Sequence, residues 1–367
     1  MSASVDQQSQ HMQLLRARLA ALRESAGFRA YEYVRERYSV IKDLEARRRS
    51  HSHAPSDYWS EELSGFEYLL DASPLIIEKL RHHTYHVTGL RVYDYRTNQD
   101  RARRKYADKL AALVEAAGSR RLLVPESPAL GGFGHIIDGE MFNLDTLKYF
   151  EVLTVLERGS VLQEFQNNTD RRLAWEIGAG WGGFPYQFKT LCPNVTYVIT
   201  DLPELFLFSA TYLMTAFPQA RVRFFGEVPA DRLFDDWQQF DFIFIPDTFH
   251  HIVRPERVDL TINMVSFQEM TSAQVSGYVQ RAWELNSPFL YSLNRDRSNY
   301  NNELVSVREC IGRHFWPREY TVLPVGYQKM LDEEPGPPER EYKHVIGWRR
   351  VTTGAAGATA TEAGPPA

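Results

Sequence analysis

The chain has 367 residues, enough for one large domain or two ordinary ones, and its composition, 43% hydrophobic and 24% charged, is that of a globular protein. The formal net charge of −5 argues against a general nucleic-acid or membrane-surface binder, because such proteins need a basic field. Only two cysteines occur, and no apolar stretch approaches the length that spans a bilayer, so the sequence predicts a soluble, cytoplasmic protein without a disulfide framework.

The first part of the chain is expected to be mostly helical. Over residues 1 to about 50, apolar side chains recur at helical spacing, which predicts helices that pack on the body of the protein or form a homo-oligomer with a second copy. Short helices mixed with loops are predicted over residues 51–150, including Tyr106–Ala117. Four glycines lie between Pro125 and Thr146, in a long loop that we interpret either as a lid or binding loop or as a structural crossing.

From Arg171 onward, strand-like and helix-like segments alternate, which is typical of a parallel sheet with helices on both faces. The predicted strands are Leu173–Ile177, Val195–Thr200, Phe240–Ile245, Val258–Met264, Pro288–Leu293, Tyr320–Val325 and Lys343–Arg350, with Arg221–Phe225 as an additional candidate. The predicted helices are Glu204–Ala216, Ser272–Leu285 and Glu303–Phe315. Because no helix of useful length separates the last two strands, we expect an antiparallel hairpin that closes the sheet.

The sequence therefore predicts an α/β fold with a doubly wound, mostly parallel, seven-stranded sheet and a helical N-terminal region. We divide the chain into a mostly helical region with the Gly-rich loop (1–150), a ligand-binding domain (151–352) and a disordered tail of Ala, Gly, Thr and Pro (353–367). Ligands of such sheets bind outside the carboxyl ends of the strands, so the segments that follow the strands carry the functional signal.

The turn after the first strand of this domain is the most informative segment. Glu176 lies near the end of the strand, and Gly178, Gly180, Gly182 and Gly183 follow, which lets the backbone turn sharply and lets a ligand approach it. Three of these glycines also satisfy the G-x-G-x-x-G pattern of dinucleotide sites, so NAD must be weighed against S-adenosylmethionine.

Three features favour S-adenosylmethionine. The carboxylate of Glu176 can meet the ammonium group of a methionine-like moiety, and Trp181 crowds the turn that would otherwise cradle a pyrophosphate. The expected closing hairpin is also more natural for a methyltransferase. A Gly-rich turn without any ligand is the least favoured interpretation.

Polar residues follow the next strands. Asp201 can accept hydrogen bonds from both ribose hydroxyls, a role shared by both nucleoside cofactors, or it can cap the following helix. Asp247 is a candidate for the adenine contact, with a simple turn residue as an equal alternative. Asn263, Ser266 and Glu269 are expected near the transferred methyl group and the acceptor, and a capped strand-to-helix connection explains them equally well.

Four runs together resemble one family. The runs PESPALGGFGHIIDGEMFNLDTLKY, WEIGAGWGGF, ITDLPE and INMVSFQEM are similar to those of sugar O-methyltransferases found with natural-product and polysaccharide biosynthesis, over roughly residues 58–348. EIGAGWGG alone is generic to methyltransferases, whereas its combination with FNLDT and SFQEM is more specific. The resemblance implies a class I methyltransferase fold, S-adenosylmethionine as the donor, and a sugar hydroxyl of a glycosylated natural product or saccharide as the acceptor.

Methyl transfer is a direct displacement, so positioning the acceptor oxygen in line with the sulfur–methyl bond is a large part of catalysis. A sugar hydroxyl is a poor nucleophile, and the candidate general bases are Glu269, His135, His250 and His251. The candidate cofactor-binding residues are Glu176, Gly178, Gly180, Gly182, Asp201, Asp247 and Asn263. Ser266 is the candidate substrate-binding residue. No compact cluster of carboxylates and histidines in the sequence indicates a metal site. Two alternative functions stay open, an NAD-dependent oxidoreductase and a non-catalytic binding partner with the same fold.

Overall fold

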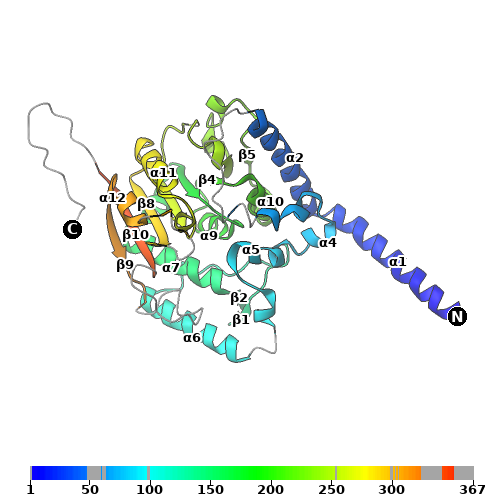
Figure 1. Cartoon of the computed structure of the whole chain (residues 1–367). Coiled ribbons are helices and arrows are strands. Elements are labelled where there is room, and N and C mark those ends of the chain that lie inside the picture. Colours follow the sequence, from blue (N-terminus) through cyan, green and yellow to red (C-terminus); the bar gives the residue numbers. More distant parts are fainter. Residues whose placement is uncertain are drawn as a thin grey trace, which may run out of the picture.

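A computed structural model describes residues 2–47, 59, 63–96, 100–252, 254–297, 301, 303–304, 306–323 and 341–350. The tail expected over 353–367 lies outside the described residues. At the centre is an eight-stranded sheet with the order β5-β6-β4-β3-β7-β8-β10-β9 (Figure 1). Its strands are β3 (Arg172–Ile177), β4 (Val195–Asp201), β5 (Val222–Phe224), β6 (Phe242–Pro246), β7 (Leu260–Met264), β8 (Phe289–Arg295), β9 (Phe315–Tyr320) and β10 (Tyr342–Arg349).

The sheet is mainly parallel. The strands from β5 to β8 in this order pair in parallel, and β10 pairs antiparallel with both β8 and β9. The mixed α/β fold, its mainly parallel sheet and the closing hairpin are thus confirmed. From β3 the chain first builds the sheet on one side, beginning with β4, and then continues on the other side of β3 with β7. The strand order therefore reverses at β3. In an open sheet, the crevice outside the carboxyl ends at such a reversal is where ligands bind.

Two apolar cores cover the two faces of the sheet. Alternate strand residues such as Ala174 and Tyr197 pack under one group of helices, and Trp175 and Val198 pack under the other. The first group is α2 (Ala26–Arg47), α7 (Leu144–Arg158), α9 (Gly183–Leu191) and α10 (Phe206–Ala216). The second is α11 (Ser272–Glu284) and α12 (Val307–Gly312). Burial on both faces explains why these strands read as continuous apolar runs.

Three sequence-based expectations about the elements need correction. The sheet has eight strands rather than seven, because Val222–Phe224 forms β5 at the edge beyond β6. The strand expected at Tyr320–Val325 lies earlier, as β9, where Phe315 is fully buried against β10. The helix expected over Glu303–Phe315 is correspondingly reduced to α12, since aromatic residues at its end suit a half-buried strand better than a helix.

The Gly-rich segment also carries a hairpin that the sequence did not predict. It consists of β1 (His135–Ile137) and β2 (Glu140–Phe142), which pair antiparallel. Gly139 sits in the turn with a φ of 83°, a conformation that glycine adopts without strain. The segment is therefore an ordered element that leads directly into α7.

The helical N-terminal region is confirmed. Its longer helices are α1 (Ser2–Arg23), α2 and α6 (Asp100–Ala117). Two further helices of this region are single turns, α4 (Pro74–Ile77) and α5 (Tyr85–Thr88). Another single turn, α8 (Gln163–Gln166), follows α7. Among the described helices, none combines the length and the apolar character that a bilayer crossing needs. α7 crosses the limit between residues 150 and 151, and the division into domains stays a prediction.

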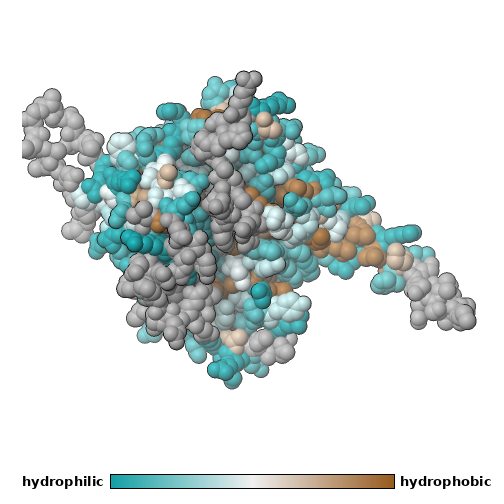
Figure 2. Space-filling view, in the orientation of Figure 1, coloured by the Kyte–Doolittle hydropathy of each residue, from teal (hydrophilic) through white to brown (hydrophobic). Residues whose placement is uncertain are grey.

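The first helix projects from the body, whereas the second lies along α10 (Figure 1). Apolar residues are visible along α1 in Figure 2, and its Leu14 is 71% exposed. A homo-oligomer formed through the N-terminal helices stays a prediction.

Candidate functional site

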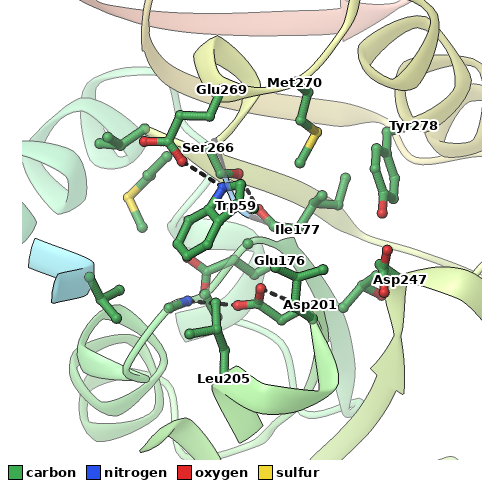
Figure 3. A pocket seen from close by; sticks show the side chains of 18 of the residues that line it. Trp59, Glu176, Ile177, Asp201, Leu205, Asp247, Ser266, Glu269, Met270 and Tyr278 are labelled. Atoms are coloured by element: carbon green, nitrogen blue, oxygen red, sulfur yellow. Dashed lines mark hydrogen bonds between the residues drawn. The ribbon is translucent and has the colours of Figure 1, made fainter. Parts of the chain in front are cut away.

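A cavity of about 350 Å³ lies at the carboxyl ends of β3, β4, β6 and β7. Its wall includes the glycine turn after β3 together with Asp201, Asp247, Ser266 and Glu269 (Figure 3). The structure therefore brings most of the sequence-predicted residues into one cavity at the point where the strand order reverses.

The glycine turn is held in close contact with its surroundings. Gly178 has a φ of 75°, and a Cβ placed on it would lie 2.2 Å from Ser266 Oγ. Gly180 has a φ of 58°, and its Cβ would lie 2.8 Å from a methyl carbon of Val87, from the N-terminal region. Both the left-handed backbone and the lack of space explain why glycine occupies these positions.

Glu176 forms the buried floor of the cavity. The residue is 1% exposed, and its Oε2 accepts a hydrogen bond of 2.9 Å from the Tyr197 hydroxyl. Its Oε1 is buried and has no hydrogen-bond partner among the described residues. Burial raises the pKa of this carboxyl well above its ordinary value. A buried acceptor without a partner at a cavity wall suits a ligand group that donates hydrogen bonds.

Asp201 connects the end of β4 to the glycine turn. Its Oδ2 accepts a hydrogen bond of 2.8 Å from the Gly180 backbone N–H, and its Oδ1 accepts one of 2.9 Å from Leu202. Burial raises its pKa to about 7. The following 3-10 helix, η4 (Pro203–Leu205), has Leu202 as its N-cap and no side-chain cap bond, so Asp201 does not act as a helix cap. Its carboxylate instead braces the turn and lines the cavity.

Asp247 lies at the far end of the cavity, directly after β6. Burial raises its pKa to about 8, and its Oδ1 is buried without a hydrogen-bond partner among the described residues. The side chains of Asp247 and Tyr278 face one another in Figure 3. His250 stacks on Tyr278 with 4.3 Å between ring centroids, and its Nδ1 lies 2.5 Å from the Asp247 carbonyl oxygen. His250 therefore belongs to this end of the cavity.

The opposite end carries Ser266, Glu269 and a residue from the N-terminal region. Trp59 Nε1 donates a hydrogen bond of 3.0 Å to Glu269 Oε2. The indole ring lies between Glu269 and Glu176 in Figure 3. Ser266 Oγ is 3.3 Å from the Ile177 carbonyl oxygen, which ties this end to the glycine turn.

Four sequence-predicted residues do not line the cavity. One is Gly182, the N-cap of α9, where an added Cβ would lie 3.1 Å from the Ser209 backbone. Asn263 is fully buried, donates to the Ile177 carbonyl oxygen over 2.8 Å, and accepts from the Phe267 N–H over 3.0 Å. It supports the glycine turn from behind. His135 packs against two tyrosine rings near the β1–β2 hairpin, and His251 is not part of the cavity wall. Within the described residues, no three His, Cys, Asp or Glu side chains come together in a group that could hold a metal ion.

Sequence reasoning missed a buried ionic network behind the turn. The Arg81 side chain is 0% exposed, and it donates to Glu126 over 2.8 Å and to Asp145 over 3.0 Å. Its guanidinium lies 3.7 Å from the centre of the Trp181 ring, and Trp181 Nε1 donates to Asp145 over 3.2 Å. Asp145 lies within the capping box that Asn143 and Thr146 form at the start of α7. The FNLDT run therefore encodes both a helix start and an anchor for the glycine turn.

No protein-family model and no curated protein sequence matches the chain. Solved structures resemble part of it. An O-methyltransferase family protein from Burkholderia thailandensis has 14% identity over 56% of this chain and 59% of that chain, with a TM-score of 0.31. The bifunctional kinase-methyltransferase WbdD has 12% identity over 55% and 40%, with a TM-score of 0.37.

A third structure, the N-methyltransferase NodS from Bradyrhizobium japonicum WM9 with S-adenosyl-L-homocysteine bound, has 10% identity over 53% of this chain and 87% of that chain, with a TM-score of 0.34. The matched part spans less than two thirds of the first two proteins. With all three TM-scores below 0.5, the function rests on the geometry of the cavity alone.

Proposed function

We propose that the chain is an S-adenosylmethionine-dependent O-methyltransferase that acts on a sugar hydroxyl. The supporting observation is the order of three acidic side chains along one cavity. Glu176, Asp201 and Asp247 lie at the carboxyl ends of three neighbouring parallel strands, and the glycine turn lies beside the first two. An ammonium group, a pair of ribose hydroxyls and an adenine amine occur in the same order along the donor.

The partners that each donor group needs are present. The unpartnered Oε1 of Glu176 suits the ammonium group, and the carboxylate of Asp201 suits the two ribose hydroxyls. The unpartnered Oδ1 of Asp247 suits the adenine amine. Gly178 and Gly180 lie on the cavity wall, where their backbone can contact a ligand.

The start of α9 disfavours a dinucleotide. In a dinucleotide fold, the pyrophosphate lies at the N-terminus of the helix that follows the glycine turn. Here a Cβ placed on Gly183 would lie 2.2 Å from a ring carbon of Trp181, so the indole covers that helix end. The indole is held in this place by its hydrogen bond to Asp145 and by the Arg81 guanidinium, which lies over the ring.

The end of the cavity with Ser266 and Glu269 suits the acceptor. The bound donor supplies a methyl group on a positively charged sulfur. We assign the general base to Glu269, whose carboxylate takes the hydroxyl proton as the acceptor oxygen gains the methyl group. Trp59 holds that carboxylate through its N–H, and Ser266 offers a hydroxyl beside it. His250 lies at the Asp247 end and His135 lies outside the cavity, which makes Glu269 the better placed base.

A sugar suits this end because of its two kinds of surface. The indole of Trp59 presents a flat apolar face, and Glu269 presents a hydrogen-bond acceptor at its edge (Figure 3). A sugar ring likewise has an apolar face and a rim of hydroxyl groups. The pairing of an aromatic ring with a polar group is common where one ligand needs both contacts.

Calorimetric titration with S-adenosylmethionine and, separately, with NAD tests the proposal. We expect binding of S-adenosylmethionine alone, followed by methyl transfer to glycosylated acceptors, detected by mass spectrometry. Binding of NAD, or of neither compound, would contradict the proposal. Donor binding without transfer to any saccharide or glycoside acceptor would leave a non-catalytic binding partner as the better description.

A further inference from the structure

Lys148 is a basic side chain on the wall of the cavity. It lies on the second turn of α7 and is 9% exposed. Its Nζ is 3.0 Å from Asp145 Oδ1 and 4.9 Å from the centre of the Tyr149 ring. The ammonium group of Lys148 is thus held beside the cavity by Asp145.

The charges next to Lys148 are already matched before Glu176 is counted. Asp145 bonds to Lys148 through Oδ1 and to Arg81 through Oδ2, and Glu126 bonds to Arg81. These four groups carry two formal positive and two formal negative charges. Glu176 is close enough to Lys148 for the lysine to lower its pKa, against the burial that raises it. Its carboxyl nevertheless keeps an unpartnered oxygen.

Glu176 and Lys148 both line the cavity, so this end presents an unpartnered acceptor oxygen and an ammonium group to the same ligand. A ligand that brings a carboxylate as well as an ammonium group can bond to both side chains. An α-amino acid carries both groups on one carbon atom. The two side chains together therefore complement an amino acid better than a simple amine.

We infer that Lys148 binds the α-carboxylate of the methionine moiety of the donor, while Glu176 binds its ammonium group. This inference rests on the proposed function and specifies how the donor is recognised. An ammonium group has three N–H donors, so Lys148 can keep its bond to Asp145 and also donate to a ligand. Asp145 is then a positioning residue for Lys148.

Other basic residues are less suited to this role. Among the described residues of the cavity wall, the only other basic side chain is His250, which stacks on Tyr278 at the Asp247 end. The Arg81 side chain is 0% exposed and covers the Trp181 ring behind the wall. The α-carboxylate is therefore expected on Lys148.

The experiment compares ligands that differ in one group. The probes are S-adenosylmethionine, its decarboxylated form, and the analogue in which hydrogen replaces the α-amino group. Calorimetry measures the affinity of each for the full-length wild type and for Lys148→Met. We expect the wild type to prefer S-adenosylmethionine over the decarboxylated form by about 10- to 100-fold, the range of a hydrogen bond to a charged group. Lys148→Met should bind these two probes equally.

Two further variants sharpen the result. Lys148→Arg should keep the preference for the carboxylate, and Glu176→Gln should lose the preference for the α-amino group while keeping that for the carboxylate. Undiminished binding of the decarboxylated form by Lys148→Met shows that the variant is folded. If that variant does not fold, Lys148→Gln replaces it. The preference of the wild type for S-adenosylmethionine over its decarboxylated form also tests the inference without any variant.

The outcomes separate the inference from the proposed function. A wild type that binds S-adenosylmethionine and its decarboxylated form equally, or a Lys148→Met variant that keeps the preference, overturns the role of Lys148 alone. A wild type that binds none of the three probes overturns the proposed function. Loss of affinity for both probes by the same factor in a folded Lys148→Met variant also contradicts the inference, because it would reflect a general disturbance of the cavity.

Discussion

The two ends of the cavity are built differently. At the end proposed for the donor, Glu176, Asp201 and Asp247 lie at the carboxyl ends of neighbouring parallel strands, and unpartnered carboxylate oxygens of two of them are buried. At the acceptor end, Glu269 belongs to a short 3-10 helix, η8 (Phe267–Glu269), and is already bonded to Trp59. Because a buried acceptor without a partner gains most from a ligand, changes at the donor end should affect binding. Changes at the acceptor end should affect turnover.

The largest effect is expected from Gly178→Ala. The left-handed backbone at this position and the 2.2 Å approach of Ser266 Oγ leave no room for a methyl group. We expect donor binding to be lost in calorimetry and the unfolding temperature to fall. Gly312→Ala is the matched control, because, apart from its chain neighbours and the backbone of its own helix, no atom lies within 4 Å of the added Cβ. Normal donor affinity in Gly178→Ala would show that the glycine turn does not form the donor site.

Glu269→Gln tests the other side of the comparison. Removal of a general base costs about 10²- to 10⁴-fold in rate, and the amide keeps the size of the side chain. We therefore expect kcat to fall by about that factor while donor affinity stays within about twofold of the wild type. The measurement pairs steady-state kinetics with calorimetry. His135→Asn is the control, since His135 lies outside the cavity, and an unchanged kcat in Glu269→Gln would exclude this residue as the base.

The donor end should also be visible in the stability of the ligand-free protein. Burial raises the pKa of Asp247 from 3.8 to about 8, so the native state holds a proton that the unfolded chain has released. This contribution to stability is complete below pH 3.8 and is lost as the pH rises through about 8.

Asp247→Asn is neutral at every pH and should escape this loss. Between about pH 5 and pH 7, its free energy of unfolding should rise relative to the wild type by about 1.4 kcal/mol per pH unit. Chemical denaturation across this range measures the difference. Asp71→Asn serves as the surface control, because the Asp71 side chain is fully exposed. A constant difference between Asp247→Asn and the wild type would mean that the carboxyl is ionised throughout.

The same contrast between the two ends explains what the sequence could predict. Glu176, Gly178 and Asp201 are recognisable because their setting is local, a buried strand followed by a turn, and the structure places all three on one cavity. The parallel sheet was predictable for the same reason, because two-sided burial produces continuous apolar strands. Strand β5, at the sheet edge with a partly exposed pattern, gave only a weak signal.

Other contacts depend on tertiary packing. Asn263 lies near the carboxyl end of β7, as a ligand-binding residue would, yet its side chain is engaged in hydrogen bonds that hold the glycine turn and the η8 segment. Trp59 lies 210 positions before Glu269, and Arg81 lies 64 before Asp145. No local pattern encodes such pairs, so the sequence alone does not place these residues at the cavity.

The smallest expected effect tests one of these distant contacts. Trp59→Phe keeps an apolar ring and removes the N–H that donates to Glu269 over 3.0 Å. Because both side chains are partly exposed, water can replace part of the bond, and we expect kcat to fall by about three- to tenfold. Donor affinity should not change. If Trp59 acts only on Glu269, the fall should vanish in the Glu269→Gln background, so a double-mutant cycle measures the coupling directly. Equal losses in both backgrounds would mean that the indole serves the acceptor through its ring face rather than through the base.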